Sequence, residues 1–264
     1  MIRQLFRIIL PALILLSAAT CRANATDITF GDEHLSYRVT YKWGFIHKVA
    51  GDARIDLTRR ASDGSYDAVL TARTRPWADP IFSVRDTLIG HMLPESMAPT
   101  LYDKNSHEGS TYRRDVIRYT YHGNSVTARI DRFKEDKKGR ITRSDTIMSA
   151  LRPNVDMLSV YYFVRRLPFE QWKKGHVAKA NIFSGAKIEL LEVTYGGITT
   201  IKLDGHQWQC YEIRFSFSSE RMRNSSAPMR AWIRTDGTRI PVKLEGELPI
   251  GKIQVLWNSD SNQK

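Results

Sequence analysis

Residues 35–45 read LSYRVTYKWGF, and large apolar side chains alternate with polar ones along this stretch. The apolar set occupies the odd positions Leu35, Tyr37, Val39, Tyr41, Trp43 and Phe45. A period of two residues is that of a β-strand, because successive side chains of a strand point to opposite faces of the sheet. The stretch therefore predicts a long strand with one buried face.

The same period continues along most of the chain, with a turn signal between successive runs. These signals are Asp63-Gly64, His122-Gly123, Gly196-Gly197, Asp204-Gly205 and Asp236-Gly237. Glycine supplies the positive φ that tight turns require, and turns this short can join only antiparallel strands. We expect ten or more strands with antiparallel neighbours.

One segment departs from this pattern. Residues 155–167 are mostly apolar and lie between Pro153-Asn154 and Pro168, which is typical of a helix that a proline ends. A second short helical turn is expected over residues 169–172. The predicted fold class is mainly all-β: a long curved antiparallel sheet or half-barrel with one or two helices packed against it. Such a body often encloses an apolar cavity.

The N-terminus has the features of a secretory signal peptide over residues 1–25. Arg3 and Arg7 precede an apolar run at residues 8–16, and Ala23 and Ala25 form an A-x-A cleavage motif. The run is about half of the ~20 residues that a membrane-spanning helix needs. We expect export to the periplasm, with residues 26–264 forming a single β-rich domain. Lipidation at Cys21 is the less favoured alternative, because the preceding residues make a poor lipoprotein motif.

The charge of the chain indicates the kind of partner. The 264 residues carry a net charge of +12, with 42% hydrophobic and 26% charged residues, which excludes collagen, a coiled coil and a disordered tail. An exported basic protein meets anionic lipid head groups and cell-wall polymers rather than nucleic acid. The expected partners are an amphiphilic ligand, an envelope protein or an anionic lipid surface, with no nucleic acid, and the expected state is a monomer.

The sequence contains no recognisable catalytic or metal motif. No two of the seven histidines lie within five residues of each other, none is next to a cysteine, and the nucleophile-elbow and phosphate-loop patterns are missing. We therefore expect a protein that is not an enzyme and that uses no cofactor and no metal. Cys210 lies in a strand-like run, where a small packed apolar side chain is its expected role.

The aromatic residues provide the candidate ligand contacts. Most of them belong to the core, but large rigid rings can also line a pocket for an acyl chain or a glycan. Trp77 is the strongest candidate, because Pro76 and Pro80 place it on a stiffened loop. The predicted ligand-binding residues are Trp43, Phe45, Trp77, Phe82, Leu158, Tyr161 and Tyr162.

Several short motifs follow one another in a characteristic order. They include Leu35-Ser36-Tyr37 with Trp43-Gly44, then Asp156-Met157-Leu158-Ser159 with Tyr161-Tyr162 and Arg165, then Ala231-Trp232-Ile233 with Asp236-Gly237. Their order over residues 31–257 resembles the bacterial family called domain of unknown function 3108. The resemblance implies an exported protein without an established activity, and it supplies no catalytic residues.

Two weaker likenesses concern parts of the chain. The C-terminal motifs are similar to the end of periplasmic lipoprotein carriers, in which a curved antiparallel sheet wraps around helices and holds acyl chains. This likeness implies that the helix at residues 155–167 packs inside the concave face of the sheet. Asp86-Thr87-Leu88 and Asp145-Thr146-Ile147 look like the O-glycosylation acceptors of Bacteroidetes envelope proteins.

These observations predict a periplasmic, non-catalytic protein that binds an apolar or amphiphilic envelope component: a lipid, a lipoprotein or a glycolipid. The alternative is a structural or scaffolding module of the envelope with a filled core and a protein partner, and a hydrolase comes third. A continuous cavity of several hundred Å³ would favour binding inside the sheet, whereas a filled core with an exposed apolar patch would favour the scaffold.

Overall fold

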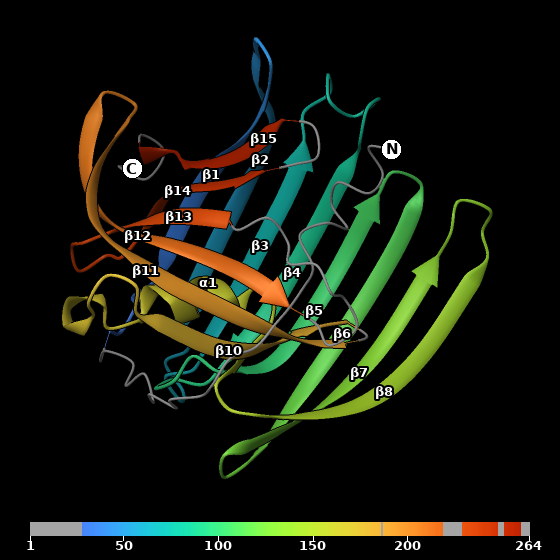
Figure 1. Ribbon diagram of the computed structural model, residues 1–264. Helices are drawn as coiled ribbons and strands as arrows, with labels where there is room; N and C mark the ends of the chain where they lie inside the picture. Colours follow the sequence, from blue (N-terminus) through green and yellow to red (C-terminus); the bar gives the residue numbers. More distant parts are fainter. Residues whose placement is uncertain (1–27, 186, 219–228, 248–250, 260–264) are drawn as a thin grey trace.

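The computed structural model describes residues 28–185, 187–218, 229–247 and 251–259. The predicted signal peptide, the cleavage residues Ala23 and Ala25, and Cys21 lie outside this part of the chain. Within it, fifteen strands form one sheet that curls into a nearly closed barrel (Figure 1). No helix in these ranges is long and apolar enough to cross a membrane.

The strands are β1 (Glu33–Trp43), β2 (Ile46–Arg59), β3 (Tyr66–Thr74), β4 (Val84–Met92), β5 (Pro99–Glu108), β6 (Thr111–His122), β7 (Ser125–Glu135), β8 (Ile141–Leu151), β9 (Asn154–Val155), β10 (Val177–Ser184), β11 (Lys187–Leu203), β12 (His206–Ser218), β13 (Met229–Arg234), β14 (Pro241–Glu247) and β15 (Lys252–Trp257). The helix α1 (Ser159–Arg165) and a turn of 3-10 helix, η2 (Phe169–Gln171), lie between β9 and β10.

The strands form a meander in which chain neighbours pair antiparallel. The order across the sheet is β8-β7-β6-β5-β4-β3-β2-β1-β15-β14-β13-β12-β11-β10-β9. The first strand pairs with the last, with Val39 opposite Val255, and the short β9 runs parallel to β10. The two ends of the sheet, β8 and β9, are consecutive in the chain. Asn181 of β10, which pairs with β9, donates a hydrogen bond from Nδ2 to the carbonyl of Leu151 in β8 at 2.8 Å. The predicted curved antiparallel sheet is confirmed.

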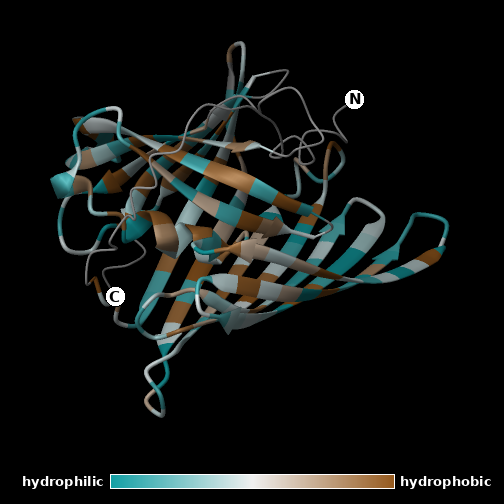
Figure 2. Ribbon diagram, turned by 60° about the horizontal axis from the view of Figure 1, so that its bottom comes forward, coloured by the Kyte–Doolittle hydropathy of each residue, from teal (hydrophilic) through white to brown (hydrophobic). Residues whose placement is uncertain are grey.

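The inner face of the barrel is packed by two clusters of apolar side chains. One joins β1–β7 to α1 and the C-terminal strands, and the other lies beneath β10–β13. The alternation of apolar and polar residues along the strands is visible in Figure 2. Cys210 is buried and free, and burial raises the pKa of its thiol to about 12, as expected for a packed side chain.

The helix α1 is shorter than the segment predicted to form it. Asn154 and Val155 belong to β9, because Val155 pairs with Ile182 of β10, and the helix ends at Arg165. Leu158 and Tyr162 are buried in the cluster formed by the surrounding strands, so the helix packs inside the curved sheet. The second short helical turn is present as η2, one residue shorter than expected.

Candidate functional site

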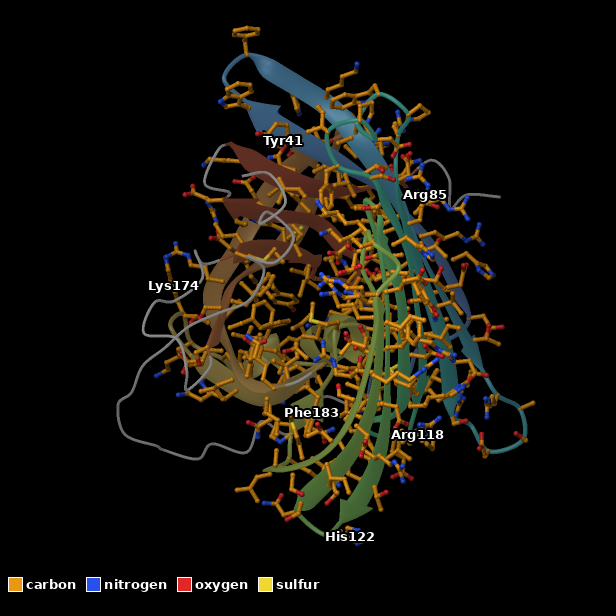
Figure 3. The ribbon with its side chains drawn as sticks, turned by 90° about the vertical axis from the view of Figure 1, so that its right-hand side faces the viewer. Tyr41, Arg85, Arg118, His122, Lys174 and Phe183 are labelled. Atoms are coloured by element: carbon orange, nitrogen blue, oxygen red, sulfur yellow. The ribbon has the colours of Figure 1, made fainter. Side chains whose placement is uncertain are left out.

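The structure separates the seven predicted ligand-binding residues into two groups. Leu158, Tyr161 and Tyr162 come from the helix region inside the barrel. Trp43 and Phe45, with Trp77 and Phe82, lie at one end of the barrel, where the β1–β2 hairpin and the β3–β4 loop project. Figure 3 shows this end near Tyr41 and the opposite end near His122. The two groups do not form one pocket.

Inside the barrel, α1 is held by a buried arginine. Arg165 is fully buried and donates to both carboxylate oxygens of Glu33, at 2.7 and 2.6 Å. It also donates to the carbonyl oxygens of Arg239 and Thr238, and its guanidinium lies 4.2 Å from the ring centroid of Phe30. Four residues therefore fix one side chain, which attaches the helix to the start of β1 and to the β13–β14 turn.

The two predicted tyrosines of α1 are part of the same packing. The hydroxyls of Tyr161 and Tyr37 are 2.7 Å apart, and the ring of Tyr161 meets that of Tyr162 edge-on at 5.0 Å. Burial raises the pKa of Tyr161 to about 12 and that of Tyr162 well above its ordinary value. These rings are positioned by one another and by Arg165, as in a structural core.

A buried carboxyl group lies at the start of α1. Asp156 Oδ1 accepts the backbone N–H groups of Leu158 and Ser159 at 2.9 and 2.8 Å, so it caps the helix. Burial nevertheless raises its pKa to about 6. Burial, and then the charge of Asp156, raises the pKa of Tyr102 and Tyr119 well above the ordinary value. Among the described residues, no group of three His, Cys, Asp or Glu side chains could hold a metal ion.

The other group of predicted residues contains two strongly exposed rings. Trp43 is the last residue of β1 and pairs with Ile46 across the hairpin turn, where Gly44 adopts a φ of +54°. Trp43 is 54% exposed and Phe45 is 99% exposed. Rings of this size are seldom left in water without a functional reason when they gather at one place.

The β3–β4 loop lies against this hairpin. Trp77 is half-buried, because its Nε1 donates to the carbonyl of Val49 at 2.8 Å and Lys48 Nζ lies 4.4 Å from its ring centroid. The same loop carries Ile81, which is 58% exposed, and the half-buried Phe82. We call Trp43, Phe45, Trp77, Ile81 and Phe82 the aromatic tip.

Lysines accompany the aromatic tip. In the β1–β2 ladder Lys42 lies opposite His47, and Lys48 lies opposite Tyr41. Neither lysine forms an ion pair within the described part of the chain. Most other outer cations are paired, as Arg75 is with Asp52 at 2.8 Å. Exposed rings next to free lysines suit the boundary between water and lipid, where the rings enter the apolar layer and the ammonium groups stay at the surface.

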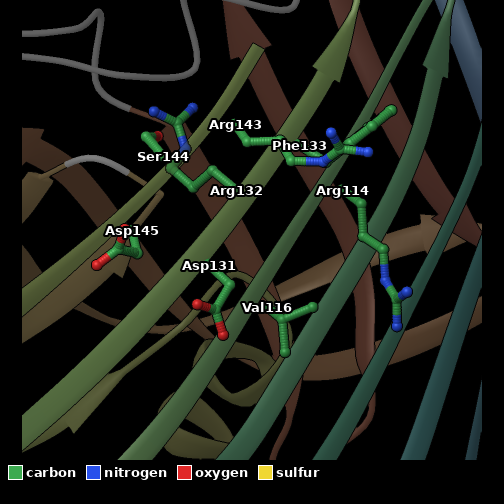
Figure 4. Close-up of a pocket in the computed structure, with 8 residues that line it drawn as sticks. All are labelled: Arg114, Val116, Asp131, Arg132, Phe133, Arg143, Ser144 and Asp145. Atoms are coloured by element: carbon green, nitrogen blue, oxygen red, sulfur yellow. The ribbon is translucent and has the colours of Figure 1, made fainter. Parts of the chain in front are cut away.

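A hollow of about 390 Å³ lies elsewhere, on the outer face of β6–β8 (Figure 4). Its lining is Arg114, Val116, Asp131, Arg132, Phe133, Arg143, Ser144 and Asp145. It is open to solvent and five of its eight lining residues are charged, so it differs from the enclosed apolar cavity that an acyl-chain carrier requires. Neither predicted glycosylation acceptor is itself a lining residue. Thr87 is half-buried on β4, and Thr146 is half-buried on β8, where its hydroxyl donates to the carbonyl of Asp145.

Sequence reasoning missed several members of these sites, of which Ile81, Glu33 and Lys48 are examples. Ile81 belongs to a loop selected for its tryptophan, and its own exposure has no sequence signal. Glu33 meets Arg165 across 132 positions, which no local pattern reports. Lys48 could have been found from its place in the hairpin that follows the strand at residues 35–45, since the register places it beside Tyr41.

Comparisons with known proteins agree with this architecture. The family model described as "Protein of unknown function (DUF3108)" matches residues 36–256. The crystal structure of a beta-barrel-like protein of domain of unknown function DUF1849 from Brucella abortus is similar with a TM-score of 0.55 and 8% sequence identity, over 88% of this chain and 97% of that chain. Identity this low shows a common fold alone. No curated protein matches the sequence.

Proposed function

This chain belongs to the DUF3108 family of proteins of unknown function, and from its own surface we propose that it is a non-catalytic periplasmic protein that binds a lipid surface through the aromatic tip. The observation that carries the proposal is the exposure of Trp43 and Phe45 beside Lys42 and Lys48. The bound envelope component is thus an amphiphile met at the end of the barrel, and not an acyl chain enclosed within it.

The interior of the barrel supports this choice. Leu158 and Tyr162 are buried among strand side chains, and Arg165 ties the helix to both halves of the chain. In this proposal these residues hold the barrel in shape and do not contact the ligand. The packing around α1 also matches one feature of the scaffold alternative. Lys42 and Lys48, which form no ion pair within the described part of the chain, favour an anionic lipid partner over an apolar protein surface.

Simple energetics indicate that the tip is large enough to bind. Burying one large side chain such as Trp or Phe contributes about 1.5–3 kcal/mol, and a lysine near an anionic surface contributes about 1 kcal/mol. The favourable binding free energy is therefore several kcal/mol, before the entropy lost by ordering the side chains is subtracted. It comes from Trp43, Phe45 and Ile81 together with Lys42 and Lys48. The result is reversible attachment, as expected of a surface contact made by a few exposed side chains.

The test is co-sedimentation of the processed, exported protein with vesicles that contain phosphatidylglycerol. We expect binding that Trp43→Ser with Phe45→Ser reduces at least tenfold, because both exposed rings are lost. The matched control is Ile198→Ser, which removes a strongly exposed apolar side chain from β11 and leaves binding unchanged.

Two results would overturn the proposal. One is a wild-type protein that does not sediment with anionic vesicles, and the other is equal binding by the double variant. Native mass spectrometry of the protein taken from its own periplasm adds an independent check, since a stoichiometric lipid retained by the double variant would place the ligand inside the barrel.

A further inference from the structure

The strand β8 forms a free edge of the barrel. It is the terminal strand of the sheet order, and among the described residues no strand pairs with its outer edge. Both figures of the whole ribbon show the β7–β8 hairpin reaching away from the body (Figures 1 and 2). A free edge presents a row of backbone N–H and C=O groups that can pair with another strand.

This edge lacks proline, lysine and β-bulges, the features that usually prevent an edge strand from pairing with another strand. The eleven residues of β8 contain neither proline nor lysine, and their register with β7 runs from Ile141 to Leu151 without a bulge. Ile141 is 53% exposed and Ile147 is 69% exposed, both on the outer face. A long, regular edge with exposed isoleucines is expected to be covered by a partner strand.

The sequence of β8 shows which partner fits. Residues 141–147 read Ile-Thr-Arg-Ser-Asp-Thr-Ile. The residues at equal distances on either side of Ser144 match one another: Ile141 with Ile147, Thr142 with Thr146, and the oppositely charged Arg143 with Asp145. In an antiparallel pair of two such strands centred on Ser144, each Arg143 faces an Asp145 and each Ile141 faces an Ile147. Opposite charges and apolar side chains in directly facing positions stabilise a sheet.

Other registers lose this match. A pair centred on residue 143 would place Arg143 opposite a second Arg143, and a pair centred on residue 145 would oppose two Asp145 carboxylates. Like charges in facing positions destabilise a pair of strands. Of these three antiparallel registers, the strand therefore favours the one centred on Ser144.

The two charged residues are available for this contact. Neither Arg143 nor Asp145 forms an ion pair within the described part of the chain, whereas the neighbouring Arg118 pairs with Asp131 at 2.7 Å. The guanidinium of Arg143 lies 5.3 Å from the ring centroid of Phe133, at the rim of the outer hollow (Figure 4). The ion pairs would thus form without breaking existing ones.

We propose that two copies of this chain associate through β8, antiparallel and centred on Ser144, so that the sheets of two barrels become continuous. The proposal replaces the monomer expected from the sequence and does not depend on lipid binding. The interface is isologous: the same seven residues act on both copies, as a two-fold axis requires.

The test is sedimentation equilibrium of the processed protein and of charge variants at β8. We expect a wild-type dimer. Asp145→Arg and Arg143→Asp each place like charges in both facing positions, so each alone weakens association at least tenfold. An equimolar mixture of the two single variants restores the facing opposite charges and yields a heterodimer, which shows that both variants remain folded. The double exchange Arg143→Asp with Asp145→Arg restores the homodimer.

The register has its own test. Ser144→Cys places two thiols opposite each other on the axis, and we expect a disulfide-linked dimer on export, where the native Cys210 is buried and does not interfere. A wild-type protein that stays monomeric at every concentration reached, or charge variants that dimerise as the wild type does, would overturn the proposal. Failure of the mixture to form a heterodimer would overturn the register.

Discussion

The buried carboxyl group of Asp156 makes the stability of the protein depend on pH. Burial raises its pKa from 3.8 to about 6, while its Oδ1 caps α1. In the unfolded chain the group releases its proton at the lower value. Between about pH 4 and pH 6 the folded protein therefore binds more protons than the unfolded chain, and the free energy of unfolding falls as pH rises through this range.

We predict that Asp156→Asn removes this pH dependence. Asparagine keeps an oxygen for the N–H groups of Leu158 and Ser159 but carries no charge. The difference in unfolding free energy between wild type and variant should change by up to about 3 kcal/mol between pH 4 and pH 7, with the variant gaining relative stability at the higher pH. Urea unfolding at intervals across this range measures it, and parallel curves for the two proteins would contradict the expected burial.

Residues also show where prediction from sequence stops. The loop position of Trp77 follows from its two prolines, whereas its hydrogen bond to Val49 depends on how the β1–β2 hairpin lies beside that loop. Arg165 could be singled out only within a family motif. Its burial against Glu33 follows from the closing of the barrel, which brings together residues 132 positions apart.

At the scale of elements, α1 depends on a glycine in the opposite strand. A Cβ atom at Gly90 of β4 would lie 3.0 Å from Leu158 Cδ2, so the helix packs against bare backbone at this point. The contact sets how closely α1 can approach the sheet. A larger side chain at position 90 would push the helix away from the inner face.

We predict that Gly90→Val lowers the free energy of unfolding by about 1–3 kcal/mol through overpacking. Because the two sites touch, Gly90→Val combined with Leu158→Ala should lose less than the sum of the two single changes. Thr87→Val on the same strand is the control and should change stability little. Urea unfolding of the four variants decides the matter, and strict additivity would mean that the helix does not rest on this glycine.

The elements themselves were largely predictable. Period-two alternation and glycine turns identify the strands, because both reflect local backbone geometry. The start of the helix was not predictable. An apolar residue such as Val155 fits a buried strand as well as a helix, and only its pairing with Ile182 makes it part of β9.

For the whole molecule, the curved sheet follows from many strands joined by short turns, but its closure does not. The pairing of β1 with β15 joins the two ends of the chain, and no local pattern specifies the partner of either strand. This pairing leaves β8 and β9 as the edges of the sheet. The free edge on β8, and with it the surface for a second copy, is thus a property of the whole fold.

The alternating strand direction gives these two surfaces a joint consequence. The turns β1–β2, β3–β4 and β7–β8 share one end of the barrel, and the β1–β2 hairpin reaches beyond the β7–β8 turn (Figure 1). Antiparallel pairing of two β8 strands reverses one copy relative to the other. In the proposed dimer the aromatic tips therefore point in opposite directions, so that each would face a different lipid surface.

A dimer of this kind is a bridge between two membranes. We predict that the wild-type protein makes phosphatidylglycerol vesicles adhere to one another, which light scattering reports as particle growth. Asp145→Arg should still bind vesicles but not join them, while the variant with both Trp43→Ser and Phe45→Ser should neither bind nor join. If Asp145→Arg joined vesicles as well as the wild type, adhesion would not require β8. A single barrel with one tip attaches to a membrane, and two barrels with reversed tips set the distance between a pair of them.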